Sequence, residues 1–565
     1  MSKKIIFTIL FAVLACTCCM AQKNKSAIKA TLKGYPSGAI DEYHFRAGKA
    51  VVKGRFANMS NRDFSTFSLK GYNNFTTQDF VRTININPDG SFLEQISLPH
   101  SGYVFFDIDA ILPESFIAVG DTLEILYDGI KGETTISGSG ATDEVNRIWP
   151  RLQKQFSSNE SETPWKQLDR QFLLDWKNRK VKELDQIARA IDADTISALK
   201  GCSNYAKDVL KTNLLAMRLN EISEAMDKWR RGCIRNEDGT INRDLMISLS
   251  IPLSTYFDFL SARQSYLLDN PLMVLAERGG WVISYMRSHA FFDYFALSNY
   301  MNRGVKGSDS KQLANYKEYF VLPHDYDSEL HRQMLEYDKG HLLSVADYYA
   351  ICSDSIRLRY KLNKTGFMMQ LSLLHEVLYF NEDEDEFTDG FLNREAEQLA
   401  GAFTQFTDPI ICHHAVDAYR RFVIKTEGVV AATPSIATPG DSIFQSLKDK
   451  YAGNVIYMDF WGMFCAPCRR GMLDQRPLVE QYKNAPVRFL YICNEQESQR
   501  EPSEEWLTKN NIQGEHIYLS SDDWNHLAAK FQFNAVPFSL LIDKNGNVVQ
   551  KRGAPSSYQI DELLK

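Results

Sequence analysis

The chain has 565 residues, of which 44% are hydrophobic and 24% are charged, and its formal net charge is −7. These values are ordinary for a soluble globular protein, and at roughly 150 residues per domain they indicate three or four domains. Because the charge is mild and no basic tract occurs, the sequence gives no electrostatic reason to expect a nucleic-acid partner.

The N-terminus has the pattern of a secretory signal. Two lysines precede an apolar run over residues 5–15, which is too short to span a bilayer as a mature helix. Cleavage after Ala21 would make residues 1–21 a signal peptide. Alternatively, the Val-Leu-Ala-Cys sequence that ends at Cys16 resembles a bacterial lipobox, which would place a lipid anchor on that cysteine. Both patterns predict export to the periplasm or cell envelope.

Residues 26–140 have the pattern of a β-rich N-terminal domain. Apolar and polar residues alternate in short runs, as in residues 50–56 and 81–86, and turn signals such as Pro-Asp-Gly at residues 88–90 separate them. Regular short strands with this punctuation predict an antiparallel, β-sandwich-like fold. No cluster of catalytic residue types stands out in this region.

Residues 141–428 have the pattern of an all-α region. Apolar residues recur mostly at spacings of three and four, as in the set Leu210, Leu214 and Met217. A helical domain between the β-rich domain and the C-terminal quarter is therefore predicted.

Two segments of the helical region contain residue types that bind metals, but neither has the ligand spacing of a metal site. The acidic run over residues 382–386 lacks the alternating ligands and central glycine of a calcium loop. The sequence Cys412-His413-His414 is compact, but adjacent residues on a helix point about 100° apart. A second ligand pair is not evident. We therefore expect no bound metal.

The strongest chemical signal lies in the last predicted domain, residues 429–565. A connector with two prolines opens it, and residues 455–461 then form an apolar, β-prone run long enough for a buried strand. Residues 462–464 turn the chain, Cys465 and Cys468 follow, and the next residues can begin a helix. Strand, turn, cysteine pair and helix is the arrangement that thiol-disulfide chemistry requires.

Cysteines three residues apart at a helix start lie close enough to bond to each other. The helix N-terminus places partial positive charge near the first sulfur, which favours the nucleophilic thiolate. We expect Cys465 to attack a partner disulfide and Cys468 to resolve the mixed disulfide. Asp459, six residues before Cys465, could accept the proton of Cys468 if burial raises its pKa. Its alternative role is that of a strand residue bonded to backbone.

This stretch resembles thioredoxin, and more closely the TlpA/ResA type of exported bacterial thiol-disulfide oxidoreductases. Asp459-Phe460-Trp461 through Cys465-Ala466-Pro467-Cys468-Arg469 matches the thioredoxin signature, and the segment from Phe531 to Val536-Pro537 matches the family's cis-proline segment. The resemblance covers about the last quarter of the chain, and it implies a C-terminal α/β thioredoxin fold.

The resemblance also implies which residues meet the partner. Val536–Pro537 would be cis and face a redox disulfide between Cys465 and Cys468, and the expected partner-contacting residues are Trp461, Ala466, Pro467, Val536 and Pro537. The sequence departs from the family at Gly471 and Leu473, where many members carry glutamate and proline, and at Phe464 and Phe538. These departures change the surface that would face a partner. The resemblance therefore implies the redox role but not the identity of the partner.

Three functions are compatible with these patterns. The first is an exported reductase of disulfide-containing envelope proteins, which uses no cofactor and needs electrons from a membrane donor because its compartment is oxidising. The second is a disulfide oxidase or isomerase that uses the same cysteines. The third is a cell-envelope binding protein whose thioredoxin-like domain is accessory.

Overall fold

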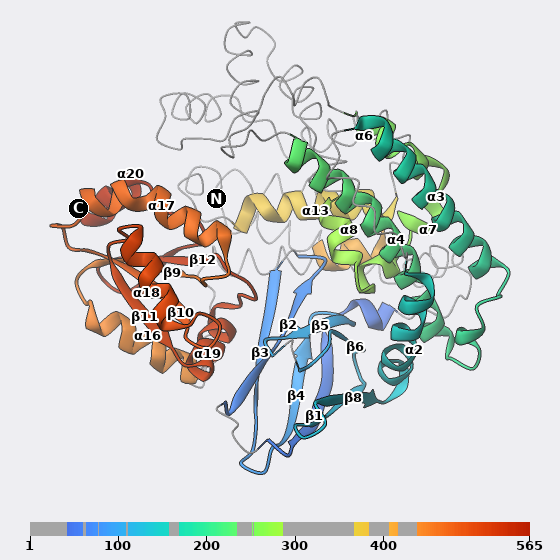
Figure 1. The fold of residues 1–565 in the computed structure, drawn as a ribbon, viewed down its shortest axis with the longest axis horizontal. Helices are drawn as coiled ribbons and strands as arrows, with labels where there is room; N and C mark the ends of the chain where they lie inside the picture. Colours follow the sequence, from blue (N-terminus) through green and yellow to red (C-terminus); the bar gives the residue numbers. More distant parts are fainter. Residues whose placement is uncertain are drawn as a thin grey trace, which may run out of the picture.

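The structure, a computed structural model, describes residues 42–59, 64–76, 78–108, 111–157, 169–233, 251, 253–285, 366–382, 406–415 and 438–565. The predicted signal peptide, the lipobox cysteine, residues 383–386 of the acidic run and residues 429–437 of the connector lie outside this part. Three regions follow one another along the chain: strands, then helices, then a mixed α/β domain (Figure 1).

The N-terminal region contains two four-stranded sheets. One has the order β4-β1-β7-β8 and the other β3-β2-β5-β6. The strands are β1 (Gly48–Ala57), β2 (Thr66–Asn73), β3 (Gln78–Asn85), β4 (Ser91–Leu98), β5 (Gly102–Phe106), β6 (Ser115–Ile117), β7 (Thr122–Asp128) and β8 (Glu133–Gly138). Val52, Phe67 and Leu123 belong to one hydrophobic core that both sheets supply. Alternation along each strand explains this, because every second side chain points to the same face.

The expectation of purely antiparallel sheets is wrong at one pair of strands. Strands β1 and β7 run parallel, with Val51 opposite Thr122 and Ala57 opposite Asp128. A parallel pair needs a long connection, and here the chain between β1 and β7 forms β2 and β3 of the second sheet, β4 of the first, and then β5 and β6 of the second. Alternation within single strands carries no information about this pairing.

Helices make up the described part of the central region. They are α2 (Gly140–Phe156), α3 (Arg170–Asp192), α4 (Asn204–Cys233), α6 (Leu253–Tyr256), α7 (Gln264–Leu267), α8 (Gly279–Tyr285) and α13 (Phe367–Glu382), with 3-10 turns at Ser197–Leu199, Asp258–Ala262 and Pro271–Leu275. A further 3-10 turn, Glu42–Phe45, precedes β1. In α2, Val145, Ile148 and Leu152 form the buried stripe that an amphipathic helix requires. Within the described part of the chain, no helix combines the length and apolarity needed to cross a bilayer.

The C-terminal region is a five-stranded sheet with helices on both faces. Its strand order is β11-β10-β9-β12-β13, with β9, β10 and β11 parallel and β12 and β13 antiparallel to their neighbours. The elements are α16 (Pro439–Lys450), β9 (Val455–Phe460), α17 (Ala466–Gln481), β10 (Val487–Asn494), α18 (Arg500–Lys509), β11 (Glu515–Leu519), α19 (Ser521–Phe531), β12 (Phe538–Ile542), β13 (Val548–Lys551) and α20 (Ser557–Leu564). All six residues of β9 are buried, as a central strand covered on both faces must be.

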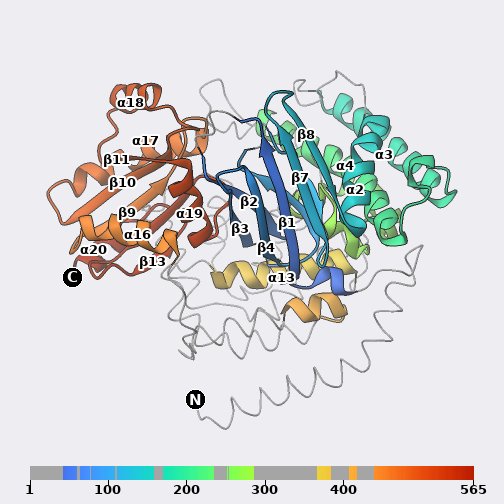
Figure 2. The same cartoon turned by 90° about the horizontal axis from the view of Figure 1, so that it is seen from below.

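Strands β2 and β3 pack against α19 of the C-terminal domain (Figure 2). The Asp522 carboxylate accepts hydrogen bonds from the backbone amides and hydroxyls of Ser65 and Thr66, over donor–acceptor distances of 2.6 to 3.2 Å. Val81 of β3 is buried within one hydrophobic core of the C-terminal domain. The two domains therefore share a specific contact that runs along α19.

Candidate active site

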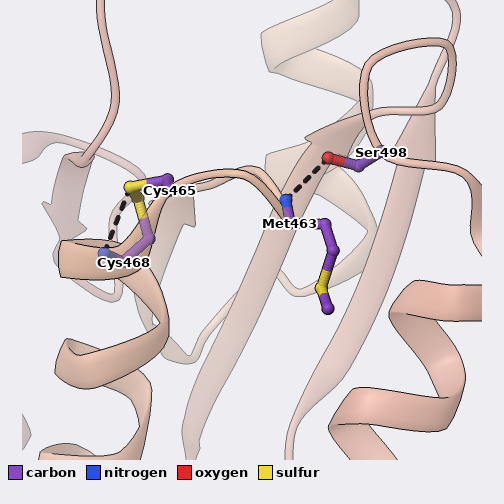
Figure 3. Close-up of a disulfide and its surroundings, with 4 residues drawn as sticks. All are labelled: Met463, Cys465, Cys468 and Ser498. Carbon is purple, nitrogen blue, oxygen red and sulfur yellow. Dashed lines mark hydrogen bonds between the residues drawn. A yellow bond between two sulfur atoms is a disulfide. The ribbon is translucent and has the colours of Figure 1, made fainter.

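Cys465 and Cys468 are joined in a disulfide at the start of α17 (Figure 3). Cys465 is the N-cap residue, and its sulfur accepts a hydrogen bond from the backbone N–H of Cys468 at 3.1 Å. Pro467 occupies the first turn, where a missing N–H costs no helical hydrogen bond. The first sulfur thus lies where the helix concentrates unpaired N–H groups and partial positive charge, which is where a thiolate is stabilised.

Both cysteines of the disulfide are buried, the first slightly less than the second. Cys465 is 6% exposed and Cys468 is 2% exposed. Ala466 and Pro467, which the resemblance assigns to partner contact, are both exposed beside them. The surface next to the buried disulfide is thus formed in part by the two residues that separate its cysteines.

A serine outside the cysteine motif holds the loop that precedes Cys465. The side-chain oxygen of Ser498 accepts the backbone N–H of Met463 at 2.8 Å (Figure 3). Ser498 is buried and follows β10, so the bond ties the cysteine loop to the neighbouring strand's end. The sequence analysis did not find this residue. Its only signal was its position just after a strand that runs parallel to β9.

Asp459 lies in the middle of the sheet, on β9. Its carboxyl is buried, and it sits in register with Tyr491 of β10 and Ser539 of β12. Burial raises the pKa of Asp459 from 3.8 to about 8. A carboxyl with that pKa gains and loses a proton near neutral pH, as a general acid–base group must.

The cis-proline segment lies at the same edge of the sheet as the cysteine loop. The Val536–Pro537 peptide bond is cis. Phe538 follows it and pairs in register with Phe460, the last residue of β9. Since the cysteine loop leaves β9 just after Phe460, the cis-proline segment and the cysteine pair meet at one sheet edge. Pro537 is exposed and Val536 is half-buried there.

Trp461 departs from its expected role at the partner surface. Its side chain is 1% exposed, and its ring centroid lies 6.2 Å from that of Trp506 on α18. Trp461 therefore packs in the same hydrophobic core cluster as Cys465 and Cys468, where its large ring buries apolar surface. Phe464, in contrast, is 64% exposed immediately before Cys465.

The remaining sulfur and histidine candidates have structural surroundings. Cys493 is a free, buried thiol on β10, and burial raises its pKa to about 12. His414 Nε2 lies 2.7 Å from the carbonyl oxygen of Phe45, and Cys412 Sγ donates to the carbonyl oxygen of Phe406 at 3.3 Å. Among the residues that the structure describes, no group of three His, Cys, Asp or Glu side chains could hold a metal ion.

Known proteins resemble the C-terminal quarter of the chain. The Redoxin family model matches residues 428–562. Thiol-disulfide oxidoreductase ResA of Bacillus thuringiensis subsp. konkukian is 26% identical over 122 residues, which cover 21% of this chain and 66% of that protein. ResA of Bacillus anthracis is 27% identical over 122 residues with the same coverage. The chain thus spans just under two thirds of the length of these curated relatives.

Two solved structures also match about a fifth of the chain. StoA from Bacillus subtilis is 16% identical and aligns with a TM-score of 0.18, covering 20% of this chain and 84% of that one. The thioredoxin domain of a thiol-disulfide oxidoreductase from Bacteroides vulgatus is 16% identical with a TM-score of 0.18, covering 20% and 80%.

The C-terminal quarter is therefore a thioredoxin-like redoxin domain. Its five-stranded sheet, its cysteine pair at a helix start and the family match all indicate this class. Within that class, the chain is similar to the ResA thiol-disulfide oxidoreductases. The strand-rich and helical regions that precede this domain lie outside the matched residues.

Proposed function

We propose that this protein is an exported thiol-disulfide oxidoreductase that reduces disulfides of cell-envelope proteins through Cys465 and Cys468. The observation that carries the proposal is the bonded cysteine pair at the start of α17, beside a cis-proline segment at the same sheet edge. The names of the ResA relatives support the reaction class. Export rests on the signal-like pattern at the N-terminus.

The reaction starts from the dithiol form. The Cys465 thiolate attacks one sulfur of the partner disulfide, forms a mixed disulfide and releases the partner's first thiolate, which takes up a proton. Cys468 then loses its proton to Asp459 and attacks the Cys465 sulfur, and the partner's second thiolate leaves. The partner gains two electrons, and the protein ends in the disulfide form that the structure shows.

Asp459 fits the role of proton acceptor because of its surroundings. Burial raises its pKa to about 8, so a useful fraction of the carboxyl is ionised at neutral pH while the group still binds protons well. The protonated carboxyl that results is neutral, which suits its buried site.

Turnover requires that the disulfide be reduced again. In an oxidising compartment the two electrons must come from a donor outside it, and a membrane-bound thiol donor fits this need. The reduction potential separates this proposal from the oxidase alternative. A value near thioredoxin's, about −270 mV, supports a reductase, whereas one near about −120 mV supports an oxidase.

Trapping tests the proposal in the full-length chain. Cys468→Ser leaves Cys465 able to attack but removes the resolving thiol, so mixed disulfides with envelope proteins should accumulate and disappear on treatment with dithiothreitol. Cys465→Ser should trap nothing. Cys493→Ser is the matched control and should behave as wild type, because that thiol is buried on a strand. Absence of any trapped protein in Cys468→Ser cells would count against protein substrates.

A further inference from the structure

The face of the β2–β3 hairpin that packs on the C-terminal domain continues beyond α19 to the cis-proline segment. Phe67 and Leu69 of β2 point into the core of the N-terminal domain, so the alternate residues Thr66 and Tyr72 point to the opposite face. Thr66 meets Asp522 of α19 on that face. Tyr72 lies further along the same face and pairs in register with Asp79 of β3.

At this end, the N-terminal domain contacts Asn534, just before the cis-proline, and Arg552, which itself lies over the residue after the cis-proline. Asn534 Nδ2 donates to the carbonyl oxygen of Gly71 at 3.3 Å. Arg552 Nη2 donates to Asp79 Oδ2 at 2.7 Å, and the same guanidinium lies over the Phe538 ring, 5.5 Å from its centroid. Asn534 precedes Pro537 by three residues and Phe538 follows it directly. The hairpin end is therefore held next to the place where a partner disulfide would bind.

These contacts are specific. The side chain of Gln532 bonds to both the N–H and the carbonyl oxygen of Val81, each at 3.1 Å, as a neighbouring strand would. The Asp79 side chain is largely buried, so its carboxylate depends on Arg552 for compensation. A surface held by such contacts keeps a fixed position relative to the cysteine pair.

Each domain contributes one exposed aromatic side chain that adjoins, in sequence or across the β2–β3 pairing, a residue of the site or of this junction. Phe464 precedes Cys465, and Tyr72 is the cross-strand neighbour of Asp79 with 39% of its surface exposed. Exposed aromatic rings of this kind act as anchors in protein interfaces, because they bury much area with few rotatable bonds. In the cis-proline segment, Ala535 and Pro537 are exposed, and the ladder of β12 begins only at Phe538.

We propose that Tyr72 of the N-terminal domain forms a second wall of the partner-binding site, opposite Phe464. The occupant is an extended, disulfide-bearing polypeptide segment with apolar side chains next to its cysteine. An extended segment can pair with the backbone before Pro537 while its side chains reach both aromatic rings. The inference rests on the proposed function and adds the partner's chemistry and the N-terminal domain's part in selecting it.

The test compares three disulfide substrates under turnover by the full-length protein, with dithiothreitol regenerating its dithiol form and the uncatalysed rate of each substrate subtracted. Two are peptides with one disulfide, flanked either by leucine and phenylalanine or by serine and glycine, and the third is bis(2-hydroxyethyl) disulfide. We expect wild type to prefer the apolar-flanked peptide in kcat/KM. Tyr72→Thr keeps a β-prone residue but removes the ring, and it should raise KM for that peptide at least about fivefold, with the small disulfide unaffected.

Two further variants make the result specific. Tyr72→Phe retains the ring and should keep the preference. Leu126→Ala removes an exposed apolar side chain from β7 of the same domain and should behave as wild type. The inference is overturned if Tyr72→Thr keeps the wild-type KM, or if wild type reduces both peptides equally well. If wild type reduces none of the three substrates, the proposed function itself has failed, and this inference goes with it.

Discussion

Replacing Asp459 by asparagine should stabilise the C-terminal domain and slow the resolving step. Burial raises the pKa of Asp459 from 3.8 to about 8, so between these values the folded chain holds a proton that the unfolded chain has released. Stability therefore falls as pH rises through this window and levels off above pH 8. Over the roughly three pH units up to pH 7, at about 1.4 kcal/mol per unit, the loss is about 4 kcal/mol as an upper bound.

Asparagine is neutral at every pH, so Asp459→Asn removes this loss. We expect the variant to be more stable than wild type at pH 7 by about 2 to 4 kcal/mol, and the difference to vanish as pH approaches 4. Urea unfolding of the full-length chain, read by hydrogen exchange of peptides from β9 and β12, measures this domain separately. The prediction fails if the difference in stability between variant and wild type is the same at pH 4 and pH 8, or if the variant is the less stable of the two at pH 8.

The same substitution has a kinetic signature. In wild type, decay of a mixed disulfide on Cys465 should speed up with pH and level off above about pH 8, as Asp459 ionises. Asp459→Asn should lose this dependence and resolve at least about tenfold more slowly at pH 8, since proton transfer by a placed group contributes about 10²-fold or more. Initial attack by Cys465 on a small disulfide should change little, because that step needs no proton from Cys468. Unaltered resolution in the variant would remove Asp459 from the mechanism.

The remaining predictions concern the buried thiol of Cys493, the Ser498–Met463 hydrogen bond and the Arg552–Asp79 ion pair. Iodoacetamide at pH 8 should modify Cys465 of the reduced native protein and leave Cys493 unmodified, because burial raises the pKa of Cys493 to about 12. Mass spectrometry of the alkylated peptides measures this, and modification of Cys493 without Cys465 would contradict the prediction. Ser498→Ala removes the acceptor for the Met463 N–H and should destabilise the oxidised domain by about 1 to 3 kcal/mol in urea unfolding, whereas an unchanged midpoint would show that the bond is dispensable. Arg552→Gln leaves the largely buried carboxylate of Asp79 without its cation, so hydrogen exchange of β3 and α19 should accelerate at pH 7; wild-type protection would mean that the pair does not hold the domains together.

The sequence was most informative where function depends on neighbours along the chain. A buried strand, a turn and two cysteines at a helix start occupy consecutive residues, so local pattern and elementary electrostatics sufficed to predict the Cys465–Cys468 pair and the place of Asp459. The cis state of Val536–Pro537 came from family resemblance, since no local rule requires it.

What escaped prediction depends on contacts between distant segments. The parallel pairing of β1 and β7, the bond from Met463 to Ser498 and the contact of β2–β3 with α19 each join residues that no periodicity links. Trp461 shows the same limit, because an aromatic residue in a redox motif can equally well face a partner or the core. Only the position of α18 and Trp506 decides that it is buried.

The proposed chemistry requires that the Cys465 sulfur be ionised and reachable at the start of α17. Alkylation of the reduced full-length protein, followed residue by residue across pH, tests it most directly, with thiolate absorbance at 240 nm as a second readout. We predict that Cys465 reacts first and that its rate rises with a midpoint well below 8.5, the usual value for a free cysteine. A midpoint at or above 8.5, or a Cys465 that reacts no faster than Cys493, would rule out a thiolate stabilised at this helix start.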